Sequence, residues 1–204
     1  MLFDDRYKTI SGSSEGNYKD RGSKFIAIAF PVISEDEVKE RLAEVKGAYH
    51  DARHHCYAYM IAPDKSVSRY NDDGEPSGTA GRPILGQINS NDLTNVLIVV
   101  VRYFGGVKLG VRGLINAYKG ATADALANAK IVTKTVKEEY EIQFAYPETN
   151  AVMRIMKETN VNIFQQEFAL NCLIKFGVRK NEAQSVYERL SKINGLKINY
   201  LRTI

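Results

Sequence analysis

The chain has 204 residues, of which 44% are hydrophobic and 25% charged, and its formal net charge is +4. These values are ordinary for a globular protein and exclude a disordered, collagen-like or low-complexity chain. The longest apolar run, residues 96–101, is far shorter than the about 20 residues that cross a bilayer.

Residues 1–10 contain acidic side chains, whereas a secretory signal has a basic region followed by an apolar one. We therefore expect a cytoplasmic protein without a membrane partner. Residues 18–32 predict one buried strand that stops at Pro31. Ser34 and Glu37 form a capping box, which predicts a helix over residues 35–46.

The middle of the chain predicts more strands and a long helix. Residues 55–62 and 67–70 indicate two paired strands joined by a turn at residues 63–65. The β-branched run within residues 93–103 is typical of a central strand. After Gly113, alanines and apolar residues at helical spacing predict a helix that packs on a sheet.

The pattern changes near Val136, and from there strand, helix, strand, strand, helix and strand follow. The predicted ranges are 139–144, 149–159, 161–168, 171–178, 182–193 and 196–201. Asn181 is the expected N-cap of the second helix. This βαββαβ order is that of the ferredoxin-like fold, so we expect an α+β protein with domains at residues 1–136 and 137–204.

Two cysteines, Cys56 and Cys172, are too few for a disulfide framework, and a structural zinc site usually needs four Cys or His ligands. Both have apolar or aromatic neighbours, which indicates buried thiols. The mildly basic net charge is compatible with nucleic acid binding only if the cations are concentrated somewhere.

Residues 69–83, here called the acidic loop, depart from ordinary core and surface patterning. The segment contains three acidic residues close together, Asp72, Asp73 and Glu75. Their carboxylates repel one another unless a cation lies nearby. They are candidate ligands for Mg²⁺. The favoured interpretation is a turn, after which Ser77 or Thr79 caps a helix whose positive end the acids favour. Gly78 and Gly81 suggest close backbone approach.

Residues 102–114, here called the cationic loop, connect the central strand to the long helix. The segment contains the cations Arg102, Lys108 and Arg112, the aromatics Tyr103 and Phe104, and the glycines Gly105, Gly106, Gly110 and Gly113. In one interpretation, bare amides and cations bind phosphates while Tyr103 or Phe104 stacks on a base. In the other, the glycines only allow a tight bend, and the residues do not decide between the two.

Other motifs are incomplete. The glycines match neither the Walker loop nor the dinucleotide fingerprint. His50 and His54 have the spacing of helical metal ligands, but the segment runs into a strand, which favours partly exposed imidazoles at a junction. His54 or His55 would form an acid/base pair with the acidic loop if the fold brought them together. We expect no cofactor, with Mg²⁺ left open.

Residues 72–83 and 102–110, in this order and at this separation, resemble the signature of the IMPACT family, and the second domain resembles that of its bacterial YigZ branch. The resemblance implies an N-terminal domain of the ribosomal protein S5 domain 2-like fold and a ferredoxin-like domain similar to the last domain of elongation factor G. Eukaryotic members regulate translation initiation during amino-acid starvation through an additional RWD domain, which we do not expect in this chain. No catalytic residue set is carried over.

The leading hypothesis is a non-enzymatic, RNA- or ribosome-associated regulator of translation in which Arg102, Lys108 and Arg112 contact phosphates. The first alternative is a Mg²⁺-dependent enzyme that acts on a small phosphorylated ligand, with His54 or His55 as general base.

A third hypothesis is a protein-interaction module for a regulatory partner. In it the two loops hold each other through Arg82 or Arg112 paired with Asp72 or Asp73. An ion pair of this kind would use the cations that the leading hypothesis assigns to phosphates.

Overall fold

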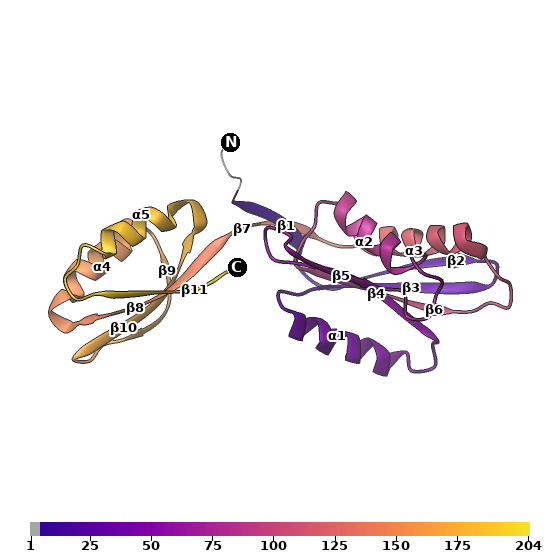
Figure 1. Cartoon of the computed structure of the whole chain (residues 1–204), viewed down its shortest axis with the longest axis horizontal. Helices are drawn as coiled ribbons and strands as arrows, with labels where there is room; N and C mark the ends of the chain where they lie inside the picture. Colours follow the sequence, from indigo (N-terminus) through magenta and orange to yellow (C-terminus); the bar gives the residue numbers. More distant parts are fainter. Residues whose placement is uncertain (1–4) are drawn as a thin grey trace. The chain divides into compact units, whose positions relative to one another are not determined.

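The computed structural model describes residues 5–204, which adopt an α+β architecture (Figure 1). The chain divides into two compact units, one formed by residues 7–134 and one by residues 135–204 together with Asp5 and Arg6. The division thus falls two residues before the expected boundary after residue 136. Residues 1–4, where the first expected domain begins, lie outside the described residues.

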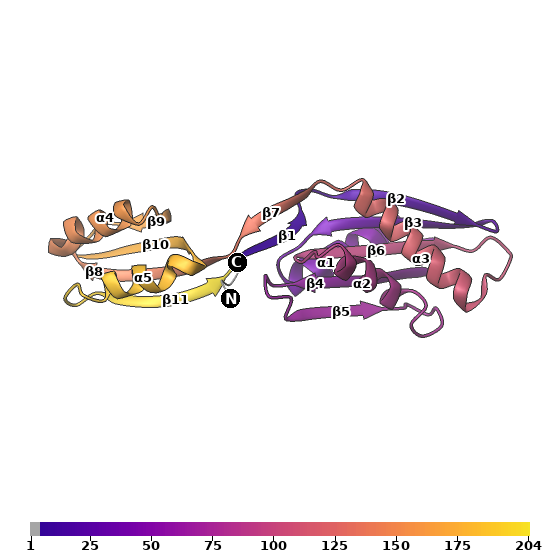
Figure 2. The ribbon, with the colours of Figure 1, turned by 90° about the horizontal axis from the view of Figure 1, so that it is seen from above.

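The unit of residues 7–134 is built on a five-stranded antiparallel sheet in the order β2-β3-β6-β4-β5 (Figure 2). Its strands are β2 (Ser14–Asp20), β3 (Ser23–Pro31), β4 (His54–Ile61), β5 (Val67–Asn71) and β6 (Val96–Tyr103). The run of β-branched residues in β6 lies in the middle of the sheet with both faces covered, as its composition predicts.

The expected single strand over residues 18–32 is wrong, because this segment belongs to a hairpin of β2 and β3. Arg21 and Gly22 adopt φ angles of 44° and 80°, which turn the chain sharply between the two strands. Arginine is not a typical residue of such turns, so the local sequence signal for the hairpin is weak.

Helices cover both faces of this sheet (Figure 1). Helix α1 (Glu35–Ala48) lies on one face, and α2 (Gly81–Ser90) and α3 (Gly110–Ala127) lie on the other. The hydroxyl of Ser34 accepts a hydrogen bond from the Glu37 amide, as the capping box predicts. Helix α3 starts at Gly110, so part of the cationic loop is its first turn.

A small two-stranded sheet of β1 (Arg6–Ile10) and β7 (Ile131–Thr135) was not expected from the sequence. Both strands are short and largely polar, so they show neither the alternation nor the apolar run that marks a strand.

The second unit is a four-stranded antiparallel sheet in the order β11-β8-β10-β9, with both of its helices on one face (Figure 1). Its elements are β8 (Lys137–Ala145), the 3₁₀ helix η1 (Tyr146–Glu148), α4 (Thr149–Glu158), β9 (Asn162–Glu167), β10 (Asn171–Arg179), α5 (Lys180–Leu190) and β11 (Lys197–Thr203). This is the ferredoxin-like order that the sequence predicts. Asn181 is not the N-cap of α5, because β10 continues to Arg179 and the helix begins at the next residue.

Within residues 5–204, no helix combines the length and the apolar character that crossing a membrane requires. Both thiols are buried, Cys56 in the first unit and Cys172 in the second, as their neighbours predict.

Candidate functional site

The acidic and cationic loops leave the same end of the five-stranded sheet. Strand β4 is antiparallel to both β5 and β6, and it pairs Tyr57 with Asn71 at the end of β5 and His54 with Arg102 near the end of β6. The strand register therefore brings together two segments that are separate in sequence. Each loop then enters a helix on the same face, α2 after the acidic loop and α3 after the cationic loop.

A buried ion pair joins the two loops. Nη1 of Arg102 donates to Oε1 of Glu75 over 2.6 Å, and the hydroxyl of Tyr118 donates to the same oxygen over 2.8 Å. The two charged side chains are only 8% and 4% exposed. The guanidinium carbon lies 5.4 Å from the ring centroid of Phe25 and 5.6 Å from that of Phe104. Arg102 is thus paired with Glu75 and packed against two rings, so its guanidinium is not the exposed phosphate contact that the leading hypothesis needs.

Cys56 extends this polar cluster from β4. Its Sγ lies 3.0 Å from the carbonyl oxygen of Asp72 and 3.2 Å from the hydroxyl of Tyr118. Burial raises the pKa of the Cys56 thiol, and the negative charge of Glu75 adds to this effect. Burial also raises the pKa of Tyr118. Both groups are therefore neutral at pH 7, and the thiol lacks the ionised form that a nucleophile needs.

Asp72 caps helix α2 from a position outside the helix. Its carboxylate accepts hydrogen bonds from the amides of Gly78, Ala80 and Gly81 at 2.8 to 3.0 Å. A Cβ atom on Gly81 would lie 2.8 Å from the backbone nitrogen of Asn71, so the chain needs glycine there to fold back this closely. The acids do favour the start of this helix, as the turn interpretation predicts.

Ser77 and Thr79 are not the caps that the sequence suggested. The structure shows no side-chain cap at the N-cap residue Ala80, and the Thr79 hydroxyl donates instead to the carbonyl of Pro76 over 2.6 Å. Ser77 is exposed. The closure of the loop decides this outcome, because it brings the Asp72 carboxylate onto the amides that a local hydroxyl would otherwise accept from.

The fold brings both histidines next to the acidic loop. The Nδ1 of His54 lies 2.8 Å from the carbonyl oxygen of Asp73, and the backbone amide of His55 donates to the Asp73 carboxylate over 2.6 Å. The Nε2 of His55 lies 3.0 Å from the carbonyl oxygen of Tyr49. Because a carbonyl only accepts, each of these ring nitrogens carries the proton. Among residues 5–204, no group of three or more His, Cys, Asp or Glu side chains is arranged to hold a metal ion.

Local backbone geometry requires the glycines of the cationic loop. A Cβ atom on Gly105 would lie 1.9 Å from the carbonyl carbon of Gly22 in the β2–β3 turn, and one on Gly113 would lie 2.8 Å from the Cβ of Leu109. Gly106 and Gly110 have φ angles of 87° and 71°. The bend thus accounts for the glycines, but it does not account for the cations beside them.

Lys108 and Arg112 are exposed, and neither takes part in an ion pair of the described part of the chain. They flank the start of α3, which has no side-chain cap and no acidic residue in its first turn. Helix α2 starts on the same face but has its amides covered by Asp72. The positive end of α3 is therefore open, whereas that of α2 is already neutralised.

The other loop residues have different surroundings. Arg82 is exposed, and the described residues form no ion pair between Arg82 or Arg112 and Asp72 or Asp73. The loops are joined by Glu75 and Arg102 instead. The Tyr103 hydroxyl donates to the carboxylate of Asp51 over 2.7 Å.

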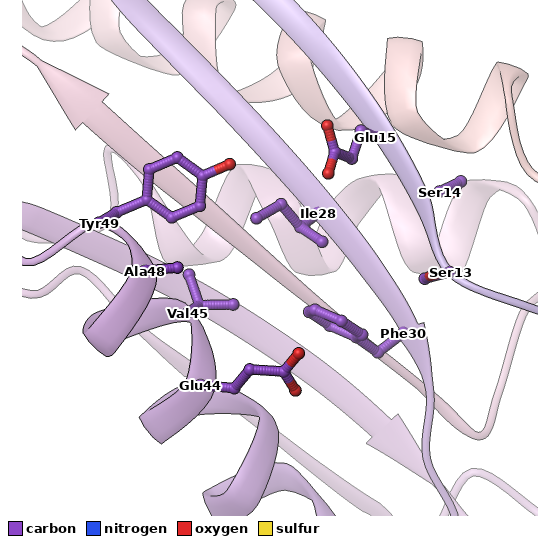
Figure 3. A pocket seen from close by; sticks show the side chains of 9 residues that line it. All are labelled: Ser13, Ser14, Glu15, Ile28, Phe30, Glu44, Val45, Ala48 and Tyr49. Atoms are coloured by element: carbon purple, nitrogen blue, oxygen red, sulfur yellow. The ribbon is translucent and has the colours of Figure 1, made fainter.

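A groove of about 460 Å³ lies between α1 and the β2–β3 hairpin (Figure 3). Its floor is apolar, with Ile28 and Phe30, and its two charged side chains, Glu15 and Glu44, are both acidic. None of the loop residues described above lines it. Because like charges repel, this groove does not favour a phosphorylated ligand.

Several of the residues around the loops were not predicted as part of a site. Phe25, Asp51 and Tyr118 each lie 43 or more positions away from the loop residue that they contact, inside segments whose patterns are those of an ordinary strand, turn and helix. The one local signal was Tyr118, a phenol within an alanine-rich helix, whose buried hydroxyl requires a partner.

Comparison with known proteins gives the family. Residues 21–126 match the family model described as the Impact N-terminal domain. IMPACT family member YigZ of Escherichia coli is 34% identical over 75% of this chain and 76% of its own length. IMPACT family member YvyE of Bacillus subtilis is 29% identical over 94% of this chain and 88% of its own. A crystal structure described as a hypothetical protein has a TM-score of 0.75 at 27% identity, over 97% of this chain and 98% of that one. The chain belongs to the IMPACT family.

Proposed function

We propose that this protein binds RNA through the cationic loop and acts, without catalysis, as a cytoplasmic regulator of translation. The observation that carries the proposal is the pair of exposed cations, Lys108 and Arg112, which form no ion pair within residues 5–204 and lie on either side of the open start of α3. Positive side chains next to bare helix amides make a surface that attracts phosphate oxygens.

The two loops have separate tasks in this proposal. The carboxylates of Asp72 and Glu75 accept from backbone amides and from Arg102, so they hold the loops in place and leave little negative charge beside the cations. The Mg²⁺-dependent alternative needs the same carboxylates as ligands. The contacts therefore favour a binding surface over a metal-assisted active site.

Family membership supports the biological setting. The resemblance to IMPACT proteins implies a connection with translation regulation, and the match of residues 21–126 covers both loops. The binding partner that we propose is therefore the RNA of the ribosome, or an RNA that enters the ribosome.

The salt dependence of RNA affinity tests the proposal. We expect the double variant Lys108→Ala plus Arg112→Ala to bind a labelled oligoribonucleotide more weakly than the wild type. It should also reduce the slope of log K against log salt by about 1.4, since each phosphate contact to a single strand contributes about 0.7. Fluorescence anisotropy over a range of salt concentrations measures both quantities.

A matched control removes the same charge elsewhere. Lys39 and Lys46 are cations of α1, on the opposite face of the sheet. The double variant Lys39→Ala plus Lys46→Ala should keep the wild-type slope. Equal losses in the two double variants would mean that only the net charge matters, and an unchanged slope in the first would overturn the proposal.

A further inference from the structure

We infer that Phe104 is a stacking platform for one unpaired base, so that the RNA taken by the cationic loop is single-stranded. This inference rests on the proposed function and adds to it the class of ligand and the residue that selects it. Phe104 directly follows β6, at the point where the cationic loop begins.

Phe104 is half exposed, and its ring packs against the buried guanidinium of Arg102. The residue is 53% exposed, and the guanidinium carbon of Arg102 lies 5.6 Å from the centroid of its ring. That guanidinium is fixed in turn by Glu75, at 2.6 Å, and by the ring of Phe25, at 5.4 Å. The ring therefore packs against a buried, paired cation and leaves other ring surface to the solvent.

This arrangement suits a base. Every nucleobase has a flat π surface, and a base stacks on an exposed aromatic ring whatever its identity. A ring that is already positioned loses little side-chain entropy when the base arrives. Lys108 and Arg112 follow in the same loop, and both are exposed.

The same geometry disfavours a duplex. In an A-form helix each base is stacked between its neighbours, and its face is closed to a side chain. The Tyr103 ring is no second platform in the loop, because it packs against the apolar cluster on the α1 face of the sheet. The proposal therefore separates the roles of the loop residues: the cations set the salt dependence, and Phe104 sets the preference for unpaired strands.

The sequence has no tryptophan, so Phe104→Trp places the only indole of the variant at the proposed platform, where it is excited selectively over the tyrosines. We expect its emission to be quenched when a single-stranded oligoribonucleotide binds, and to change little with a duplex of the same length. The variant Phe104→Leu, which has no ring for a base to stack on, should bind the single strand about 5- to 150-fold more weakly than the wild type. Its salt slope should stay unchanged, because leucine removes no phosphate contact.

Two controls make the comparison specific. Phe164, in the other unit, is also a half-exposed phenylalanine, and Phe164→Leu should leave affinity for the single strand unchanged. An abasic strand should bind the wild type and Phe104→Leu equally, because it has phosphates but nothing to stack. Thermal unfolding checks that each variant is folded.

The outcomes distinguish the two proposals. If the wild type binds single strands with a normal salt slope and Phe104→Leu binds them equally well, the stacking role is wrong and the proposed function stands. If the wild type binds neither single strands nor duplexes, both are wrong. Quenching of Phe104→Trp by an acidic peptide or by anionic vesicles, but not by RNA, would overturn both and assign the loop to a different partner.

Discussion

Glu75 and Arg102 stand 27 positions apart in the sequence, and in the folded protein their side chains meet at 2.6 Å with almost no exposure to solvent. Glu75 belongs to the acidic loop and Arg102 to the end of the central strand. This one contact ties the two characteristic segments of the chain together. The guanidinium of Arg102 also packs against the ring of Phe104. The stability of the fold and the shape of the proposed binding surface therefore depend on the same ion pair.

Removing one partner of this pair should be costly. We expect Glu75→Gln to lower the free energy of unfolding of the 7–134 unit by about 3–5 kcal/mol, because it leaves the buried Arg102 without its counter-charge. Urea unfolding followed by circular dichroism measures this. The double variant Glu75→Leu plus Arg102→Met should recover much of the loss, since paired apolar groups leave no buried charge. A single variant as stable as the wild type would show that the pair is not needed.

Asp72 should stabilise α2 as a cap and not act as a metal ligand. We expect Asp72→Ala to lower the free energy of unfolding by about 2 kcal/mol, at the upper end of cap substitutions, because three amides lose their acceptor. Asp36→Ala, which removes an exposed acid from the first turn of α1, is the matched control and should cost far less. If added Mg²⁺ raised the melting temperature of the wild type but not of Asp72→Ala, the metal interpretation would be the correct one.

Gly105→Ala should destabilise the protein by about 3 kcal/mol, because the new methyl group would overlap the backbone of Gly22 and one of the two backbone segments would have to shift. Gly47→Ala is a suitable comparison. Nothing lies within 4 Å of a Cβ at Gly47, which is inside α1, so alanine there should stabilise the protein by up to about 1 kcal/mol. Thermal and urea unfolding of both variants would decide, and equal stabilities would contradict the close approach.

Cys56 should make the 7–134 unit less stable at alkaline pH. Since burial raises the pKa of its thiol, the folded protein keeps the proton that the unfolded chain releases. The contribution is therefore fully present below the ordinary thiol pKa and is lost as the pH rises above it, at a rate of up to about 1.4 kcal/mol per pH unit for one proton.

Urea unfolding at pH 7 to 10 measures this loss. Cys56→Ala should flatten the profile between pH 8.5 and 10, whereas Cys172→Ala, in the other unit, should leave it as in the wild type. A profile that is equally steep without Cys56 would mean that other groups cause the decline.

Elements with a local cause were predictable. The start of α1 follows from Ser34 and Glu37, three residues apart, and the central place of β6 follows from its run of β-branched residues. The βαββαβ order of the second unit follows from alternating patterns along the chain. In each case the signal lies within one segment: either two residues a few positions apart interact, or the composition and periodicity of the segment favour one structure.

Contacts between distant segments were not predictable in this way. Arg102 reads as one of three equivalent cations, and only the register of β4 against β6 turns it inward toward Glu75 while Lys108 and Arg112 stay outside. Asp72 reads as one of three equivalent acids until the loop closes on α2. The sequence by itself determined which segments carry the charges, the glycines and the two aromatic residues. Only the tertiary structure decided which charges neutralise each other, because a buried ion pair depends on distances that pairing register and loop closure set.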